Sequence, residues 1–172
     1  MSDGFPGRFT SARLQAERLT PDHLPEVRRM HQDPAVMAQL GGVRSEEQTT
    51  AYMDRNLQHW ADYGFGLWIV RERSGGAPIG RAVLRHLLID GVGDVEVGYA
   101  FYEPYWGRGL ATEIAARCVA LAREELQLAT VVGLTDPGNR ASRHVLEKVG
   151  LTYERDCVHE GHPSALFRAR LR

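Results

Sequence analysis

The sequence has few of the features that mark secreted or membrane proteins. Its two cysteines, Cys118 and Cys157, lie far apart, so no disulfide framework of the kind found in small secreted domains is expected. No apolar run approaches the roughly 18 residues of a membrane-spanning helix. The first ten residues also lack the apolar segment of a secretory signal. We therefore expect a cytoplasmic protein with no membrane partner.

An excess of charge of one sign is absent as well. The 21 basic residues balance 22 acidic ones, for a formal net charge of −1. The basic residues are scattered from Arg8 to Arg172 without forming a block, and Lys148 is the only lysine. No overall field draws such a chain onto nucleic acid, so no nucleic-acid partner is expected. The oligomeric state, monomer or homodimer, stays open.

The composition that is present belongs to an ordinary globular protein. The 172 residues are 43% hydrophobic and 25% charged, and a chain of this length can bury a substantial core as one domain. Residues 1–8 contain two glycines and a proline without hydrophobic periodicity, which predicts a flexible tail. Residues 9–172 are predicted to form the single domain.

Hydrophobic periodicity predicts a mixed order of helices and strands. Helices are expected over about 22–40, 45–63, 108–126 and 139–149. Strands are expected over 14–19, 65–73, 79–88, 95–101, 129–134, 151–155 and 165–171. The strand and helix alternation after residue 95 indicates βαβ connections, and therefore a sheet that is parallel in part.

A glycine-bearing turn at residues 103–113, Glu-Pro-Tyr-Trp-Gly-Arg-Gly-Leu-Ala-Thr-Glu, opens an amphipathic helix. The first turn of a helix has unsatisfied N–H groups and a partial positive charge, so the amides from Gly107 to Thr112 are candidates for binding a phosphate or diphosphate. Glycines at 107 and 109 allow a close approach, although an isolated G-x-G also occurs in purely structural turns. The spacings of the ATP and dinucleotide loops are absent.

Segment 106–113 resembles the coenzyme A loop of the GNAT superfamily of acetyl-CoA-dependent N-acetyltransferases. Glu96-Val-Gly-Tyr99, Asn139-Arg-Ala-Ser142 and Leu146-Glu-Lys-Val-Gly-Leu151 resemble the branch that includes the ribosomal-protein alanine N-acetyltransferases. The likeness covers about residues 14–171. It implies an α/β (α+β) fold with a mixed, mostly antiparallel central sheet of about seven strands, splayed in the middle and flanked by helices.

The resemblance also implies acetyl-CoA as co-substrate, an amine acceptor that is a small molecule or a protein N-terminus, and no metal. The diphosphate is expected on the amides of the loop, the acyl carbonyl near amides of the strand, and the pantetheine arm beside an asparagine. Trp106 departs from the Gln or Arg that usually begins this loop, but an amide cradle does not depend on it. The cofactor-binding residues so implied are Tyr99, Phe101, Gly107, Arg108, Gly109, Leu110, Ala111, Thr112 and Asn139.

Transfer of acetyl from a thioester to an amine requires a neutral amine, donors for the developing oxyanion and a tolerable thiolate leaving group. Glu96 lies on a strand face beside Gly98 and Ala100, so it is a candidate base, directly or through water. The alternative is a carboxylate paired with an arginine. At the position where the family often has a tyrosine that protonates the thiolate, this chain has Leu146. The resemblance implies that Ser142 lies near the sulfur instead. We expect the Ser142 hydroxyl to orient rather than to protonate.

Two further groups of residues have structural explanations that compete with functional ones. Segment 157–162 carries one cysteine and two histidines, but its spacing matches no closed zinc motif. Trp60, Phe65 and Trp68 would either line an acceptor pocket or form core.

Together these features predict an N-acetyltransferase that works by direct attack in a ternary complex, without a covalent enzyme intermediate. A non-catalytic acyl-CoA-binding or protein-interaction module on the same fold is the alternative. A nucleotide-phosphate binder without coenzyme A also stays open, because helix N-termini bind many anions.

Overall fold

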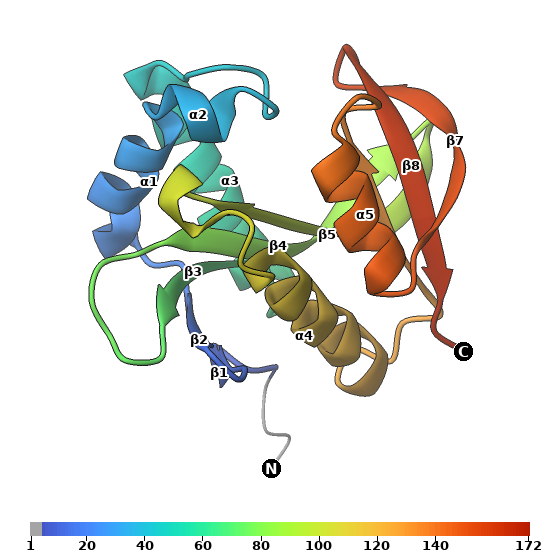
Figure 1. Ribbon diagram of the computed structural model, residues 1–172, viewed down its shortest axis with the longest axis horizontal. Coiled ribbons are helices and arrows are strands. Elements are labelled where there is room, and N and C mark those ends of the chain that lie inside the picture. The colour runs from blue at the N-terminus through green and yellow to red at the C-terminus, as the bar shows by residue number, and fades with distance from the viewer. Residues whose placement is uncertain (1–4) are drawn as a thin grey trace.

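One mixed sheet organises residues 5–172, the part of the chain that the computed structural model describes (Figure 1). The eight strands of this part are ordered β1-β2-β3-β4-β5-β6-β8-β7. They are β1 (Arg8–Thr10), β2 (Leu14–Arg18), β3 (Leu67–Glu72), β4 (Gly80–Ile89), β5 (Val92–Phe101), β6 (Thr130–Thr135), β7 (Thr152–His159) and β8 (His162–Arg170). Within it, β5 and β6 form the one parallel pair. The mixed, mostly antiparallel sheet is therefore confirmed, with one strand more than the seven expected.

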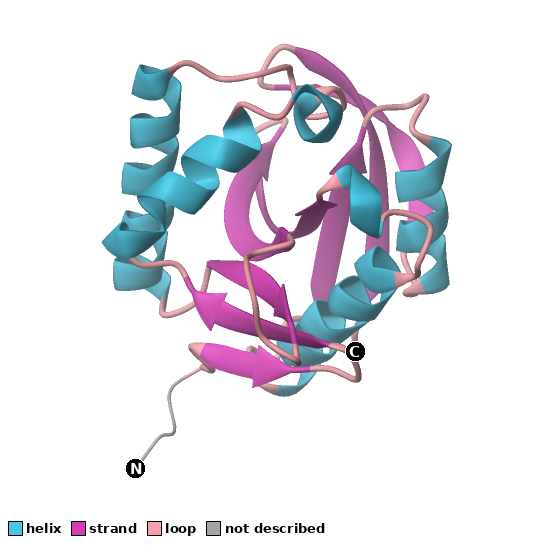
Figure 2. Cartoon of the chain, turned by 60° about the vertical axis from the view of Figure 1, so that its left-hand side comes forward, coloured by secondary structure: helices cyan, strands magenta, loops and turns pink. Residues whose placement is uncertain are grey.

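Helices flank the strands on both sides (Figure 2). They are α1 (Leu24–His31), α2 (Pro34–Met37), α3 (Glu46–Tyr63), α4 (Leu110–Glu124) and α5 (Arg140–Lys148), with short 3-10 turns η1 (Pro21–His23) and η2 (Glu103–Tyr105). The single helix expected over 22–40 is wrong. Pro34 cannot continue a helix, and the Asp33 carboxylate accepts hydrogen bonds from the amides of Ala35 and Val36, so a new helix starts there.

Two hairpins close with two-residue turns, and the strands beside these turns are longer than expected. Asp90 and Gly91 have φ of 49° and 79°, and Glu160 and Gly161 have φ of 49° and 80°. Two consecutive positive φ angles are typical of type I′ turns, which match the twist of the adjoining strands. Strand β5 consequently begins at Val92, three residues before the expected start, and β7 extends to the second turn.

The extra strand, β1, lies at the start of the described residues. Its three residues are too few for a periodic pattern, and it pairs antiparallel with β2. Just before it, the Phe5 ring packs against Phe65 and Trp68, with centroids 5.8 Å and 5.7 Å apart, and the Trp68 indole N–H donates to the Pro6 carbonyl. Of the tail predicted over 1–8, residues 1–4 lie outside the described residues, and the domain boundary at residue 9 stays a prediction.

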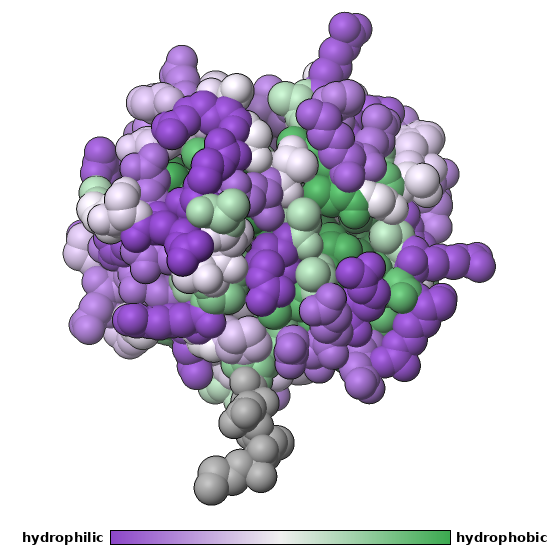
Figure 3. Space-filling view, turned by 60° about the horizontal axis from the view of Figure 1, so that its bottom comes forward, coloured by the Kyte–Doolittle hydropathy of each residue, from purple (hydrophilic) through white to green (hydrophobic). Residues whose placement is uncertain are grey.

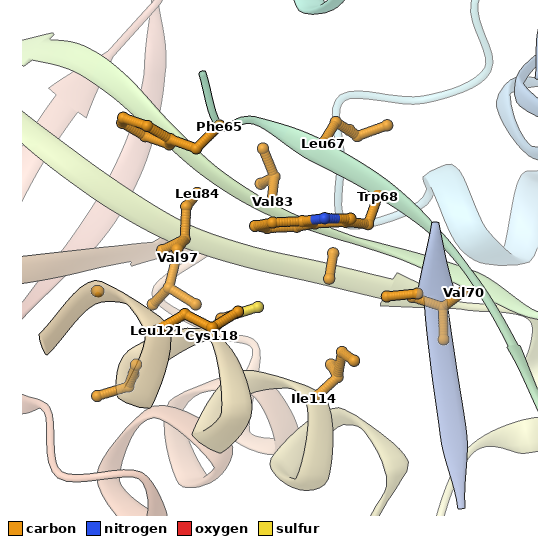
Figure 4. Packing of buried hydrophobic residues seen from close by; sticks show 14 of the residues in the cluster. Phe65, Leu67, Trp68, Val70, Val83, Leu84, Val97, Ile114, Cys118 and Leu121 are labelled. Atoms are coloured by element: carbon orange, nitrogen blue, oxygen red, sulfur yellow. The ribbon is translucent and has the colours of Figure 1, made fainter. Parts of the chain in front are cut away.

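The core between the sheet and α4 fixes the helix that begins at the glycine turn. Trp68, Leu84 and Val97 point toward Ile114 and Cys118 of α4, while Val83 points to the other face of the sheet (Figure 4). Cys118 is fully buried, and burial raises the pKa of its thiol to about 12, so it is a core residue.

Helix α5 packs on β6 through a close approach at Gly133. A Cβ at this position would lie 2.6 Å from Cδ2 of Leu146, so any larger residue would push the helix away. Leu146 itself is 1% exposed. This contact sets the distance between the start of α5 and the strands beside it.

Polar side chains cover most of the side of the molecule that Figure 3 presents, and apolar side chains come to the surface there between them, most extensively to the right of the centre. Within residues 5–172, no helix is long and apolar enough to span a bilayer.

Candidate active site

The site is built where β5 parts from β6. Strand β5 pairs with β4 over its whole length, but its pairing with β6 has one register position, Glu96 opposite Val132. Beyond that position, alternate amides of β5 face away from β4 with no strand of the described chain to pair with. The splayed middle strands are thus confirmed. They leave N–H donors between Val97 and Phe101, including the region of Tyr99, open to a bound group.

The glycine turn supplies a second set of free amides. Gly107 and Gly109 have φ of 71° and 76°, and Gly109 is the N-cap of α4. Leu110, Ala111 and Thr112 form the first turn of that helix. In the described chain, no amide from 107 to 112 donates a turn or cap hydrogen bond, and helix geometry leaves the first-turn amides without partners. These donors meet at the positive end of the helix dipole, which suits a diphosphate.

Arg13, in the turn between β1 and β2, braces this loop. Its Nε donates to Oε1 of Glu113 over 2.8 Å, and its Nη1 donates to the carbonyl oxygen of Arg108 over 2.8 Å. The Ser11 hydroxyl donates to the same carboxylate. Burial alone would raise the pKa of Glu113, but the hydrogen bonds from Ser11 and Arg13 lower it below its usual value. The sequence analysis missed Arg13 because the contact joins segments about a hundred residues apart.

Trp106 ties the loop to the end of β5. Its indole N–H donates to the carbonyl oxygen of Phe101 over 2.7 Å, while about half of the residue stays exposed. The Arg108 guanidinium stacks on the Tyr105 ring, 5.5 Å from its centroid, and lies 3.5 Å from the carboxylate of Glu72. The two sets of free amides are thereby held next to each other.

Glu96 is paired with Arg85, its direct neighbour on β4. Nε of Arg85 donates to Oε2 over 2.8 Å, and the Glu96 side chain is 9% exposed. The charge of Glu96 raises the pKa of Arg85 above its usual value against the opposite effect of burial. Oε1 accepts no hydrogen bond within the described chain and lies 3.8 Å from where a Cβ on Gly98 would stand. The structure thus shows the arginine pair at Oε2, and the role of Glu96 as a base stays a prediction.

The N-terminus of α5 brings three predicted residues together. Asn139 is the N-cap, and its Oδ1 accepts from the amide of Ser142 over 3.1 Å. The Tyr99 hydroxyl lies 3.2 Å from Oγ of Ser142 and donates to the Ser142 carbonyl oxygen, also over 3.2 Å. Burial raises the pKa of Tyr99 to about 12, against a smaller lowering by Ser142, so the phenol is protonated at neutral pH.

Glu96 and Tyr99 lie on opposite faces of β5, because side chains alternate along a strand. Tyr99 faces α5, whereas Glu96 shares its face with Arg85 and with the α3 side of the sheet. A group held along the edge of β5 would therefore have a carboxylate on one side and a pair of hydroxyls on the other.

Other candidates lie elsewhere or serve the core. Trp60, Phe65 and Trp68 are each at most 5% exposed and pack in the main core. His144 is exposed on α5. Among residues 5–172, including segment 157–162, no three His, Cys, Asp or Glu side chains lie close enough together to hold a metal ion.

The sequence analysis also missed Arg85, although the sequence contains a pattern that could have indicated it. Arg81 and Arg85 are charged residues on an otherwise apolar run, spaced so that they share one face of β4. A charge repeated on one face of a central strand indicates a partner there, and the partner of Arg85 is Glu96.

Known proteins match this chain over most of its length. The family model described as the acetyltransferase (GNAT) domain matches residues 13–152. The uncharacterized protein YkkB of Bacillus subtilis is 31% identical over 138 residues, which are 80% of this chain and 80% of that protein.

Solved structures share the fold over nearly the whole chain. An acetyltransferase from Agrobacterium tumefaciens superposes with a TM-score of 0.84 at 26% identity, covering 99% of this chain and 97% of the other. RimL, a ribosomal α-N-protein acetyltransferase in complex with coenzyme A, superposes with a TM-score of 0.75 over 98% of both chains. Its identity is 16%, which shows a common fold.

Proposed function

Because this chain belongs to the GNAT acetyltransferase family, we propose that it transfers acetyl from acetyl-CoA to a primary amine by direct attack in a ternary complex. The observation that carries the proposal is the divergence of β5 from β6, which leaves unpaired strand amides next to the unpaired amides of the glycine turn. Two adjacent sets of N–H donors fit a ligand that has a diphosphate and a carbonyl.

The residues present fit acetyl-CoA, which supplies the acetyl group as a thioester. The amides from Gly107 to Thr112 would hold its diphosphate, and alternate amides between Tyr99 and Phe101 would donate to the acyl oxygen. Asn139 has already used Oδ1 as an N-cap acceptor, so its amide nitrogen is the atom left to contact the pantetheine arm.

Glu96 is proposed to take the proton from the attacking amine, directly or through water. At pH 7 an amine with a pKa of about 10.4 is neutral in roughly one molecule in a few thousand, and an α-amine with a pKa of about 8 in roughly one in ten. A base is therefore needed most for lysine-like amines. Arg85 holds Oε2 and leaves Oε1 beside Gly98 to accept the proton.

Ser142 and Tyr99 are proposed to position the leaving sulfur. A thiol with a pKa near 8.5 departs as its anion with little help at neutral pH. The Tyr99 phenol stays protonated throughout the neutral range and donates its one proton to the Ser142 carbonyl oxygen, so the Ser142 hydroxyl is the donor left for the thiolate. This assignment replaces the tyrosine that the family often has at the position of Leu146.

The reaction is proposed to take place in the cytoplasm. Cys118 and Cys157 are both free thiols in the structure, which suits a reducing compartment.

The test is release of thiol from acetyl-CoA by the purified protein, measured against a panel of primary amines that includes free amino acids, polyamines and short peptides. Amine-dependent release, with the acetylated amine detected by mass, supports the proposal. Tight binding of acetyl-CoA without turnover on any amine would favour the non-catalytic acyl-CoA-binding module instead.

A further inference from the structure

Three arginines gather around Tyr52 on the face of the sheet that carries Glu96. Arg81 and Arg85 come from β4, and Arg44 comes from the loop between α2 and α3. The guanidinium carbon of Arg44 lies 5.0 Å from the centroid of the Tyr52 ring, and that of Arg81 lies 5.9 Å from it. All three arginines are half-buried.

Two of these charges lack a counter-ion. Arg85 is paired with Glu96, but within residues 5–172 neither Arg44 nor Arg81 makes an ion pair. Burial lowers the pKa of Arg44, and the nearby charge of Arg81 lowers it further. Burying half of a cation without a partner costs free energy. The presence of two such cations, Arg44 and Arg81, in one place therefore indicates that an anion binds there.

His31 does not supply that counter-ion. Its Nδ1 is hydrogen-bonded to Oγ1 of Thr49 over 2.9 Å, and its Nε2 lies 3.4 Å from Nη1 of Arg44. Burial, and then the charges of Arg44 and Arg81, lower the pKa of His31 to about 4. The ring is therefore neutral at pH 7, and it can accept from Arg44 without adding charge.

The hydroxyl of Tyr52 is a separate observation that points to a ligand. Tyr52 is 2% exposed, and its hydroxyl is the one buried side-chain polar atom without a hydrogen-bond partner in the described chain. Buried polar groups in folded proteins almost always have partners. A hydroxyl left unpaired among arginines suits the oxygen of a bound anion.

The strand register places Gly98 and Ala100 between this group and Glu96, and the Val83 side chain packs over Gly98. Arg81 stands opposite Ala100, and Val83 stands opposite Gly98, so two small residues follow Glu96 along the same face of β5. Ala100 lies four residues from Glu96, or roughly 13 Å at ~3.3 Å per residue, and the arginine side chains shorten that span. An amine at Glu96 and an anion at the arginines would fit in one molecule.

Resting on the acetyl transfer proposed above, we infer that the acceptor carries a carboxylate together with its primary amine, and that Arg44, Arg81 and the Tyr52 hydroxyl bind this carboxylate. A free amino acid and an acidic residue next to a peptide N-terminus offer the same two groups.

The experiment compares amines that differ only in the carboxylate. Each free amino acid is assayed for acetyl-CoA-dependent thiol release beside its own carboxamide, and Ala-Asp dipeptide amide is assayed beside Ala-Asn dipeptide amide. We expect kcat/KM to favour the acid over the amide by roughly a hundredfold in the arm that contains the natural acceptor. Equal values in both arms would overturn the inference while leaving acetyl transfer intact.

Three variants locate the binding group. Arg44→Met and Arg81→Met should each raise KM for the acid at least tenfold and leave KM for the amide unchanged. Arg29→Met is the matched control, because Arg29 also stacks on a tyrosine, with its guanidinium carbon 5.2 Å from the centroid of Tyr102 rather than on Tyr52. If both arginine variants discriminate like the wild type, the assignment is wrong.

Tyr52→Phe keeps the test decisive if an arginine variant fails to fold. Because the Tyr52 hydroxyl has no partner among residues 5–172, its removal should leave Tm unchanged or raise it, while KM for the acid rises several-fold. If no amine is acetylated, calorimetric binding of the same acids to protein saturated with coenzyme A replaces turnover. Equal affinity of wild type and Arg81→Met for them would then overturn the inference.

Discussion

The hydroxyl of Tyr99 lies 3.2 Å from both the carbonyl oxygen and Oγ of Ser142, so one phenol joins the C-terminal part of β5 to the first turn of α5. The two residues are 43 positions apart. Their contact joins β5 to α5 at the place where β5 and β6 diverge. It makes the two hydroxyls one unit, whose parts should not act independently.

That unit predicts non-additive kinetics. Tyr99→Phe and Ser142→Ala should each lower kcat/KM by about tenfold, and the double variant should lose little more, because either change breaks the same hydrogen bond. Tyr153→Phe is the control, since the Tyr153 hydroxyl also makes one hydrogen bond, to Asp156 over 3.1 Å, but on exposed β7. Losses that multiply in the double variant would show that the hydroxyls act separately.

Glu96→Gln should reduce kcat by about a hundredfold or more, the usual contribution of a positioned base, while acetyl-CoA affinity stays within about twofold. The substitution keeps the shape of the side chain but removes the proton acceptor. Turnover and calorimetric affinity are measured on the same preparation. Glu154→Gln, which breaks an exposed pair with Arg168 at 3.1 Å, controls for the loss of an ion pair. Unchanged turnover in Glu96→Gln would remove Glu96 from the chemistry.

Arg13→Ala should weaken acetyl-CoA binding by roughly tenfold, because it releases both Glu113 and the carbonyl of Arg108 and lets the glycine turn move. The expected signature is a lower affinity with a nearly unchanged kcat. Arg8→Ala is the comparison, since the Arg8 side chain is 84% exposed and 3.7 Å from its partner Glu17. If both variants bind acetyl-CoA like the wild type, Arg13 does not brace the loop.

His31 predicts acid sensitivity of the fold. Its folded pKa of about 4 lies below the ordinary value of about 6.5, so the unfolded chain binds a proton in this window that the folded chain does not. Stability is then lost as pH falls from 6.5 toward 4, by about 1.4 kcal/mol per pH unit, or about 2 kcal/mol between pH 7 and pH 5.

The measurement is urea unfolding of the wild type, His31→Gln and His144→Gln at pH 7 and pH 5. The loss between the two pH values should shrink in His31→Gln and stay at the wild-type value in His144→Gln, where the histidine is exposed. An equal loss in all three proteins would contradict the assignment.

The parts of the site that could be predicted from the sequence are those written in consecutive residues. The turn from Gly107 to Thr112 and the beginning of α5 next to Asn139 each depend on a few neighbouring positions, and both form where they were expected. The order of helices and strands follows from local periodicity for the same reason.

What could not be predicted depends on contacts between distant segments. The Arg85 and Glu96 pair requires the register of β4 against β5, and the Arg13 brace joins the first turn to the start of α4. The group of arginines around Tyr52 brings together residues of β4, of α3 and of the loop between α2 and α3. Strand β1 was missed because three residues carry no period, although sheet pairing is enough to order them.

The most direct test of the central claim is calorimetric titration of acetyl-CoA into the wild type, Gly109→Glu and Gly75→Glu. Gly109 and Gly75 both have positive φ, 76° and 98°, so each variant gains the same side chain and similar backbone strain, but Gly75 lies in the turn between β3 and β4. The amide cradle predicts micromolar binding by the wild type and Gly75→Glu, and none by a folded Gly109→Glu. Binding by Gly109→Glu as tight as that of the wild type, or no binding by the wild type, would contradict it.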